Sequence, residues 1–263
     1  MTDFMPRILS RIGDTLFPAS CPICRAETAS PRTVCAACWQ DIAFIGPGGC
    51  NHCGRPLPGP FETGPGMICE DCHAASRPWR RGAAVFRYEG AGRRLVLQLK
   101  HADRLDLVPM LAHWAMRSGG HLLRDADIVA PIPLHWSRRL KRRGNQSAEL
   151  ARRLVRQCRH DPLFAPRLLI RHRRTPSQDG RDRAGRIANV AGALRVNPRI
   201  RMNDRRVLLV DDVMTTGATL AEAARQCRAA GAAAVDILVL ALVFGDESSY
   251  IRAPEEDEAH EAD

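Results

Sequence analysis

The sequence predicts an α/β protein in which a mostly parallel sheet is flanked by helices and preceded by a small metal-binding unit. From residue 83 onward, short apolar runs that fit buried strands alternate with segments of helical spacing. Four Cys-x-x-Cys pairs are crowded ahead of that region. The chain of 263 residues has room for a full α/β domain and a smaller unit. We expect the metal-binding unit over 15–80, the α/β domain over 81–246 and an acidic, disordered tail over 247–263.

Composition restricts the classes of partner and compartment. A net charge of +10 and a pI near 9.6 indicate either a polyanionic partner or a surface that is merely rich in arginine. Charged residues interrupt Met1 to Ser20, so no signal peptide is predicted. The longest apolar run, Ile237 to Phe244, is too short to cross a bilayer. We therefore expect a soluble cytoplasmic protein without a membrane span, whose reduced thiols favour metal over disulfides.

The cysteine pairs predict two structural zinc sites. Two thiolates of one tight Cys-x-x-Cys turn reach the same ion at about 2.3 Å, and two such turns complete a closed tetrahedral site. A segment this short buries too little apolar surface to fold alone, so the metal must supply folding free energy. We pair the first four cysteines at one ion and the last four at the other, while an interleaved pairing and a redox role remain alternatives. The expected ligands are Cys21, Cys24, Cys35, Cys38, Cys50, Cys53, Cys69 and Cys72.

The elements that follow are predicted from apolar patterning, in chain order. A short helix at Ile8 to Phe17 precedes the cysteines. Strands are expected at Ala83 to Tyr88, Asp127 to Pro133, Arg167 to Ile170, Val207 to Val210 and Val235 to Val243. Helices are expected at Gly90 to Lys100, running into a turn, and at Leu107 to Arg117, Ser147 to Cys158 and Ala218 to Ala230, the last ending at Gly231.

A cluster of cations lies between the second strand and the following helix. Five of the six residues from Arg138 to Arg143 are Arg or Lys, and they repel one another. One interpretation is a mobile loop that closes on an anion such as pyrophosphate. The other is a solvated basic face.

The most informative stretch is Val207 to Thr219, which reads VLLVDDVMTTGAT. Asp211 and Asp212 end a buried strand, which is where open parallel sheets bind ligands. The residues that follow offer backbone N–H groups, three hydroxyls and a glycine at a helix N-terminus, and they suit a phosphate. Together the two halves fit the hydroxyls and the phosphate of a ribose 5-phosphate; the alternative is an ordinary turn with Thr caps and surface carboxylates. The phosphate-binding candidates are Thr215, Thr216, Gly217, Ala218 and Thr219.

This stretch resembles the PRPP-binding signature of type I phosphoribosyltransferases. The order of further motifs, from the cysteine pairs through LQLKH, PIPLHWSRRLKRRGNQ, TPSQ and R-x-x-N-V to the signature, resembles the ComF family of competence-associated proteins. That family carries an N-terminal double zinc ribbon on a phosphoribosyltransferase-like domain, and the resemblance covers roughly residues 15 to 245. The chain departs from the family at Gln178 to Arg181, where an apolar-Ser pair is usual.

The resemblance implies a chemistry and roles for particular residues. Mg-bound PRPP would lose pyrophosphate from C1 to a nitrogen nucleophile, with Asp211 and Asp212 on the ribose hydroxyls and on water bound to Mg²⁺. Purine-salvage enzymes place an Asp where this chain has Thr215, which argues against a purine acceptor and names no other. A role in DNA uptake, with single-stranded DNA and a competence helicase as partners, is implied by the family alone. The cations expected on pyrophosphate are Lys100, Arg138, Arg142 and Arg143.

A competing hypothesis is a non-catalytic adaptor for single-stranded nucleic acid with a relict or regulatory PRPP site. Zinc ribbons and arginine clusters would hold the phosphate backbone with a steep salt dependence. Base stacking is limited by an aromatic content of 5%. The tryptophans available for it are Trp39, Trp79, Trp114 and Trp136.

Overall fold

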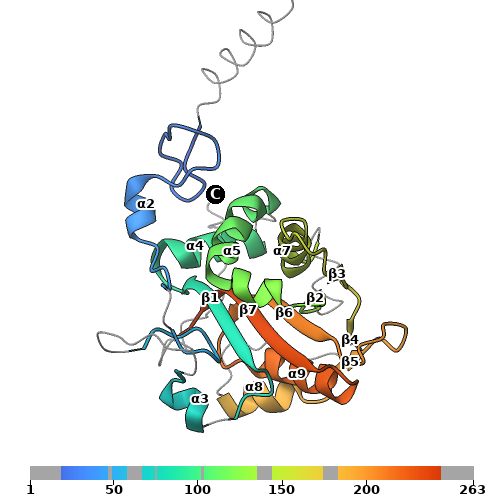
Figure 1. The fold of residues 1–263 in the computed structure, drawn as a ribbon. Helices are drawn as coiled ribbons and strands as arrows, with labels where there is room; N and C mark the ends of the chain where they lie inside the picture. The colour runs from blue at the N-terminus through green and yellow to red at the C-terminus, as the bar shows by residue number, and fades with distance from the viewer. Residues whose placement is uncertain are drawn as a thin grey trace, which may run out of the picture.

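A five-stranded, wholly parallel sheet forms the centre of the molecule, in the strand order β1-β7-β6-β2-β3 (Figure 1). The computed structural model describes residues 19–46, 49–57, 67–74, 76–101, 104–134, 144–173 and 183–243. The main strands are β1 (Arg81–Arg87), β2 (Ile128–Pro131), β3 (Leu163–Phe164), β6 (Arg206–Met214) and β7 (Ala234–Leu242). A separate antiparallel pair consists of β4 (Leu169–Arg171) and β5 (Leu194–Val196). The expected mostly parallel sheet is confirmed.

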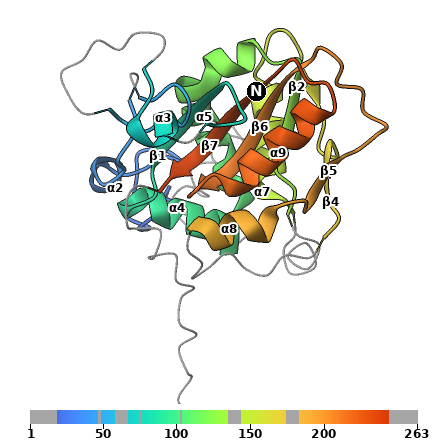
Figure 2. The ribbon, with the colours of Figure 1, turned by 90° about the horizontal axis from the view of Figure 1, so that it is seen from below.

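Helices cover both faces of the main sheet (Figures 1 and 2). One face carries α4 (Gly90–His101), α5 (Val108–Arg124) with the preceding 3-10 turn η1 (Leu105–Leu107), and α7 (Gln146–Val155). The other carries α9 (Ala218–Ala229), with α8 (Arg183–Val190) packed beside α9. Successive side chains of a strand point to opposite faces, so Leu208 packs with the first set and Leu209 with the second. Because both faces are covered, the middle of each main strand is mostly apolar, as the sequence shows.

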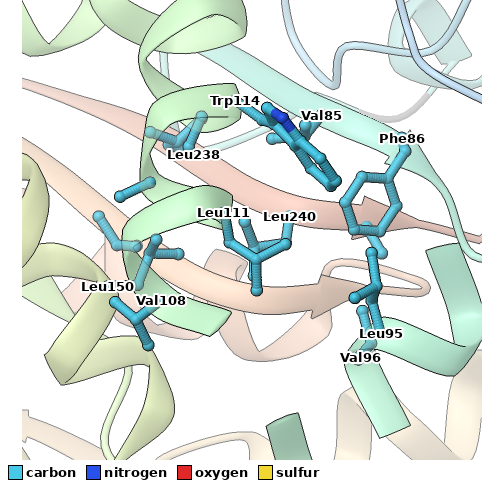
Figure 3. Close-up of a cluster of buried hydrophobic side chains, with 14 of the residues drawn as sticks. Val85, Phe86, Leu95, Val96, Val108, Leu111, Trp114, Leu150, Leu238 and Leu240 are labelled. Carbon is cyan, nitrogen blue, oxygen red and sulfur yellow. The ribbon is translucent and has the colours of Figure 1, made fainter. Parts of the chain in front are cut away.

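The core on the α5 face is drawn in Figure 3. Side chains of β1 and β7, among them Phe86 and Leu240, meet Leu95 of α4 and Leu111 of α5. All four are fully buried. Truncating such a residue to Ala costs about 2–5 kcal/mol, so this cluster holds α4 and α5 firmly on the sheet.

Several element boundaries differ from expectation. β6 continues to Met214 rather than stopping at Val210, because β7 remains paired with it as far as Leu242 while β2 ends opposite Val210. α5 continues through two glycines to Arg124, since Gly119 lets the helix approach Leu238, whose Cδ1 would lie 2.5 Å from an added Cβ. The strand expected at Arg167 to Ile170 belongs to the small antiparallel sheet, and β3 takes the fifth place in the main sheet.

The cysteine-rich segment lies along the free edge of β1. Its short helices α2 (Ala36–Gln40) and α3 (Glu70–Ala74) lie on opposite sides of that strand (Figure 1). The backbone N–H of Ile45 donates to the carbonyl of Val85 at 2.9 Å, and that of Gly82 donates to Asn51 at 2.7 Å. An open sheet edge invites pairing with other chains. Here the segment covers the edge of β1 and makes it part of the fold.

Three expected features lie outside the described residues: the helix at Ile8 to Phe17, the basic loop from Arg138 to Arg143, and the acidic tail. Within the described ranges, no helix has the length and apolar character needed to cross a membrane.

Candidate functional site

The eight cysteines of the four pairs gather into two tetrads. Cys21, Cys24, Cys35 and Cys38 form one, and Cys50, Cys53, Cys69 and Cys72 form the other, with all sulfurs of each tetrad within 4.8 Å of one another. The Sγ atoms of Cys53 and Cys69 lie 3.7 Å apart. Four sulfurs at about 2.3 Å from a tetrahedral zinc ion lie about 3.8 Å from each other, so the second tetrad has the dimensions of a zinc site. The pairing of the first four and the last four cysteines is the one expected.

The chemistry of the sulfurs also fits a metal. A hydrogen bond from the Cys53 thiol lowers the pKa of Cys50 to about 4, and the same interaction raises the pKa of Cys53. A thiolate is the form that binds zinc. All four sulfurs of the second tetrad belong to buried residues, which is typical of a closed structural site.

The two signature carboxylates lie at the carboxyl end of β6, beyond the end of β2. Asp212 is 9% exposed, and its Oδ1 lies 3.2 Å from Nζ of Lys100. Asp211 accepts hydrogen bonds from the hydroxyl of Ser147 at 3.1 Å and from the N–H of Asp212 at 2.9 Å. Burial, and then the charge of Asp212, raise the pKa of Asp211 to about 7.

Two helices supply the partners of these carboxylates. Lys100 is in the last turn of α4 rather than in a turn beyond it, so its side chain extends from a fixed helix end. Ser147 is in the first turn of α7, where Asn145 caps the helix by accepting from the N–H groups of Ser147 and Ala148. The Asn145 amide also donates to Ile132 at 3.0 Å, just after β2. The start of α7 is thereby attached to the same sheet edge as the carboxylates.

The loop after β6 leads directly into α9. Gly217 is the N-cap of α9 with φ 76°, a left-handed conformation that favours glycine. The Thr216 hydroxyl accepts a hydrogen bond from the N–H of Ala218 at 3.3 Å. The N–H groups of a helix's first turn have no carbonyl partners within the helix, and they attract anions. The loop therefore places a helix N-terminus only a few residues after the two carboxylates.

The cysteine-rich segment contacts this loop directly. Arg77 Nη1 donates to the carbonyl of Thr216 at 3.0 Å, and its guanidinium lies over the Trp79 ring at 5.3 Å. Trp79 Nε1 in turn donates at 2.6 Å to the carbonyl of His52, which lies between Cys50 and Cys53 of the second tetrad. Nothing in the sequence pattern indicates that Arg77 contacts the loop or that Ser147 contacts Asp211, because each contact joins elements that are distant in the chain.

The structure brings Lys100, Asp211, Asp212 and the loop from Thr215 to Thr219 to one end of the sheet. The remaining cations expected there, Arg138, Arg142 and Arg143, lie outside the described residues. The described chain resumes at Gly144, immediately before the Asn145 cap of α7.

Comparisons with known proteins match both parts of the chain. Residues 12–73 match the family described as "Double zinc ribbon domain", and residues 126–259 match "Phosphoribosyl transferase domain". The DNA utilization protein YhgH of Salmonella typhimurium is 31% identical over 237 residues, which cover 85% of this chain and 96% of that protein. Competence protein F of Haemophilus influenzae is 26% identical over 234 residues, covering 86% and 97%.

Among solved structures, a purine phosphoribosyltransferase from Pyrococcus horikoshii Ot3 aligns with this chain. The alignment covers 54% of this chain and 73% of the chain of that enzyme. Its sequence identity is 18% and its TM-score 0.28, an overlap too small to support an argument. β1, α4 and α5 lie between the two matched family ranges, yet they belong to the same sheet and helical layer as the rest.

Proposed function

We propose that this chain, which belongs to the ComF family together with DNA utilization protein YhgH and competence protein F, binds Mg-PRPP at the carboxyl end of its sheet. The observation that carries the proposal is the geometry around the signature. Two carboxylates with fixed partners precede an anion-binding helix N-terminus by only a few residues. A ribose 5-phosphate carries vicinal hydroxyls at one end and a phosphate at the other, which matches this arrangement.

The proposed roles follow from the positions of the residues. Asp211 and Asp212 accept hydrogen bonds from the ribose hydroxyls and from water on the Mg²⁺ that accompanies the substrate. The loop from Thr215 to Thr219 holds the 5′-phosphate. Lys100, already 3.2 Å from Asp212, reaches the side on which pyrophosphate leaves. The expected loop cations Arg138, Arg142 and Arg143 assist it there.

The reaction is a transfer of the phosphoribosyl group to nitrogen. The bond between C1 and the pyrophosphate oxygen breaks, and its electron pair leaves with pyrophosphate. A bond forms between C1 and the acceptor nitrogen, which releases a proton. Positive charge develops on the ribose and negative charge on the leaving group, so catalysis depends on positioned charges rather than on a covalent nucleophile. The loop has Thr215 where purine-salvage enzymes carry a carboxylate, so we propose an acceptor other than a purine.

The test is a calorimetric titration of Mg-PRPP into zinc-loaded protein. We expect micromolar binding, reduced more than about tenfold in the double variant Asp211→Asn, Asp212→Asn. The matched control is Asp204→Asn, which removes one exposed carboxylate at a positive φ that Asn tolerates. Equal affinities in the wild type and the double variant would overturn the proposal. Binding that is confirmed justifies a screen of nitrogen acceptors by pyrophosphate release.

We further propose that this site serves DNA uptake in natural competence, with single-stranded DNA and a competence helicase as partners. The names of the relatives concern DNA utilization and competence, and a net charge of +10 suits a polyanionic partner. If no Mg-PRPP binds, a non-catalytic nucleic-acid adaptor becomes the better candidate. DNA binding that hardly changes between low and moderate salt would contradict both the role in DNA uptake and the nucleic-acid adaptor.

A further inference from the structure

A cavity of about 730 Å³ lies where the two halves of the zinc ribbon meet the α/β domain. Its lining comes from three places: the ribbon on either side of residues 47–48, the first five residues of β1, and one side of α5. The signature carboxylates are at the opposite, carboxyl end of the sheet strands. The cavity is therefore separate from the proposed PRPP site, and its size is within the range of small-ligand sites.

Aromatic rings form one wall of the cavity. Phe44 lies with its ring centroid 4.7 Å from that of Trp39 and 5.1 Å from that of Trp114. Trp114 is buried against Val85 and Phe86 in the core (Figure 3), so core packing holds its ring in place beside Phe44. Trp39 is nonetheless 49% exposed and Phe44 36% exposed. Large aromatic surfaces left open beside a cavity are characteristic of binding sites for planar groups.

The facing side of the cavity carries basic side chains, of which Arg117 is the one charged group without an ion-pair partner among the described residues. His113, Arg117 and His121 follow one another at intervals of four residues along α5, so they form one row, and all three are exposed. Arg81 of β1 lies near the end of that row and is held by Asp236 at 2.7 Å and by Asp125 at 2.8 Å. No carboxylate is among the residues that line the cavity in the described part of the chain. None of the ion pairs between described residues includes Arg117, so its charge is available to an anion.

We propose that this cavity binds one nucleotide of a single-stranded nucleic acid, with the base against Trp39 and Phe44 and the adjoining phosphate at Arg117. Aromatic stacking accepts any base, and a nearby cation holds the backbone, which is the combination that single-strand-binding proteins use. A base within a duplex is stacked on its neighbours and does not reach such a cavity. The proposal extends the DNA-linked part of the proposed function and does not require that PRPP be bound.

The test is fluorescence anisotropy of a labelled oligothymidylate with full-length, zinc-loaded protein. We expect Trp39→Ala to weaken binding about tenfold, since stacking on one aromatic ring contributes roughly that factor. Trp39→Phe should retain most of the affinity. Arg117→Glu should weaken binding by a similar factor and reduce the slope of log K against log salt by about one, because one phosphate contact is lost. The matched control is Arg195→Glu, the same charge reversal at an exposed site on β5 in the separate small sheet.

Competition with free thymidine monophosphate identifies the source of the nucleotide. If thymidine monophosphate displaces the labelled oligonucleotide only at concentrations far above those at which unlabelled oligonucleotide does, a strand is the ligand. If the two compete at equal concentrations, that choice is overturned in favour of a free nucleotide. Wild-type affinity in both Trp39→Ala and Arg117→Glu overturns the site altogether. Zinc content and Mg-PRPP titration of the same variants exclude unfolding, and the Asp211→Asn, Asp212→Asn protein should bind the oligonucleotide normally. The two proposals can therefore fail independently.

Discussion

Asp211 and Asp212 are neighbours in the chain but have different surroundings. Asp212 forms an ion pair with Lys100, whereas Asp211 has a hydroxyl and a backbone N–H as partners. Desolvation opposes the charge on Asp211, and the neighbouring carboxylate repels it, so the pKa of Asp211 rises to about 7. Asp211 therefore exchanges a proton near neutral pH.

This difference predicts a pH dependence of stability. The pKa of Asp211 rises on folding from 3.8 to about 7, so between these values the folded protein keeps a proton that the unfolded chain has released. The free energy of unfolding should therefore fall as pH rises through this window, by no more than about 1.4 kcal/mol per pH unit for one proton. Urea unfolding of wild type and Asp211→Asn at about pH 5.5 and about pH 7 measures this fall in the free energy of unfolding. A wild-type slope that matches that of Asp211→Asn would contradict the assignment.

Arg77, which follows the second cysteine tetrad, contacts the loop that we propose to hold phosphate. Arg77→Ala removes the hydrogen bond to the Thr216 carbonyl and the cation over Trp79, so the loop loses a support. We expect Mg-PRPP affinity to fall by roughly tenfold, since a hydrogen bond from a charged group contributes about 1.5 kcal/mol. Arg77→Lys should recover part of it. Arg55→Ala, which breaks an ion pair with Asp71 in the same ribbon, is the control and should bind PRPP as wild type does.

At the scale of elements, the connection from β6 to α9 is held by its backbone conformation. Gly217 has φ 76°, and a Cβ added to it would lie 3.1 Å from the Trp79 ring and 3.3 Å from Arg77 Nη1. A side chain at this position therefore meets both backbone strain and a neighbour that must move. The loop conformation and its contact with the ribbon depend on the same glycine.

Two glycines provide a matched comparison. Gly192→Ala, at φ 61° with nothing within 4 Å of the added Cβ, should cost about 1 kcal/mol of stability through strain alone. Gly217→Ala should cost about 1–2 kcal/mol and also weaken Mg-PRPP binding, because the loop has to shift. Urea unfolding and calorimetry on both variants separate the two effects. A Gly217→Ala protein with wild-type PRPP affinity would show that the loop does not depend on its left-handed residue.

The whole molecule is organised around the edge of β1 that the ribbon covers. The first tetrad packs with the cluster on the α5 side of the sheet, and the second packs with the cluster on the α9 side. The ribbon thus joins both layers of the α/β domain at one edge. Zinc bound at the two tetrads would stabilise the ribbon, and the ribbon covers the edge strand of the sheet.

This arrangement predicts different effects for the two metal sites. Purified protein should hold two zinc ions, and each site should be lost separately in Cys24→Ser and Cys69→Ser. Cys69→Ser should remove hydrogen-exchange protection from the Gly82 amide, which donates to Asn51, and should weaken Mg-PRPP binding. Cys24→Ser should leave PRPP binding nearly unchanged. Total metal well below two ions per chain, or unchanged Gly82 protection in Cys69→Ser, would refute the structural role.

The sequence by itself was sufficient for the local features. Cys-x-x-Cys spacing implies metal sites because two sulfurs of one turn reach one ion, and continuous apolar runs such as Val207 to Val210 imply strands covered on both faces. The signature predicted the strand, the carboxylates and the following helix for the same reason. All of these depend on residues within a few positions of one another.

Contacts between distant segments were decided by the tertiary structure. The partition of eight cysteines into two tetrads, the ion pair of Lys100 with Asp212 and the bond from Arg77 to Thr216 all join residues more than ten positions apart. The same holds for Trp39 and Trp114, whose rings lie 5.7 Å apart beside the proposed nucleotide cavity. Which segments meet depends on the order of strands in the sheet and on the face that each helix covers. Neither is encoded in local spacing, because both arise from burying the apolar surface of the whole chain at once.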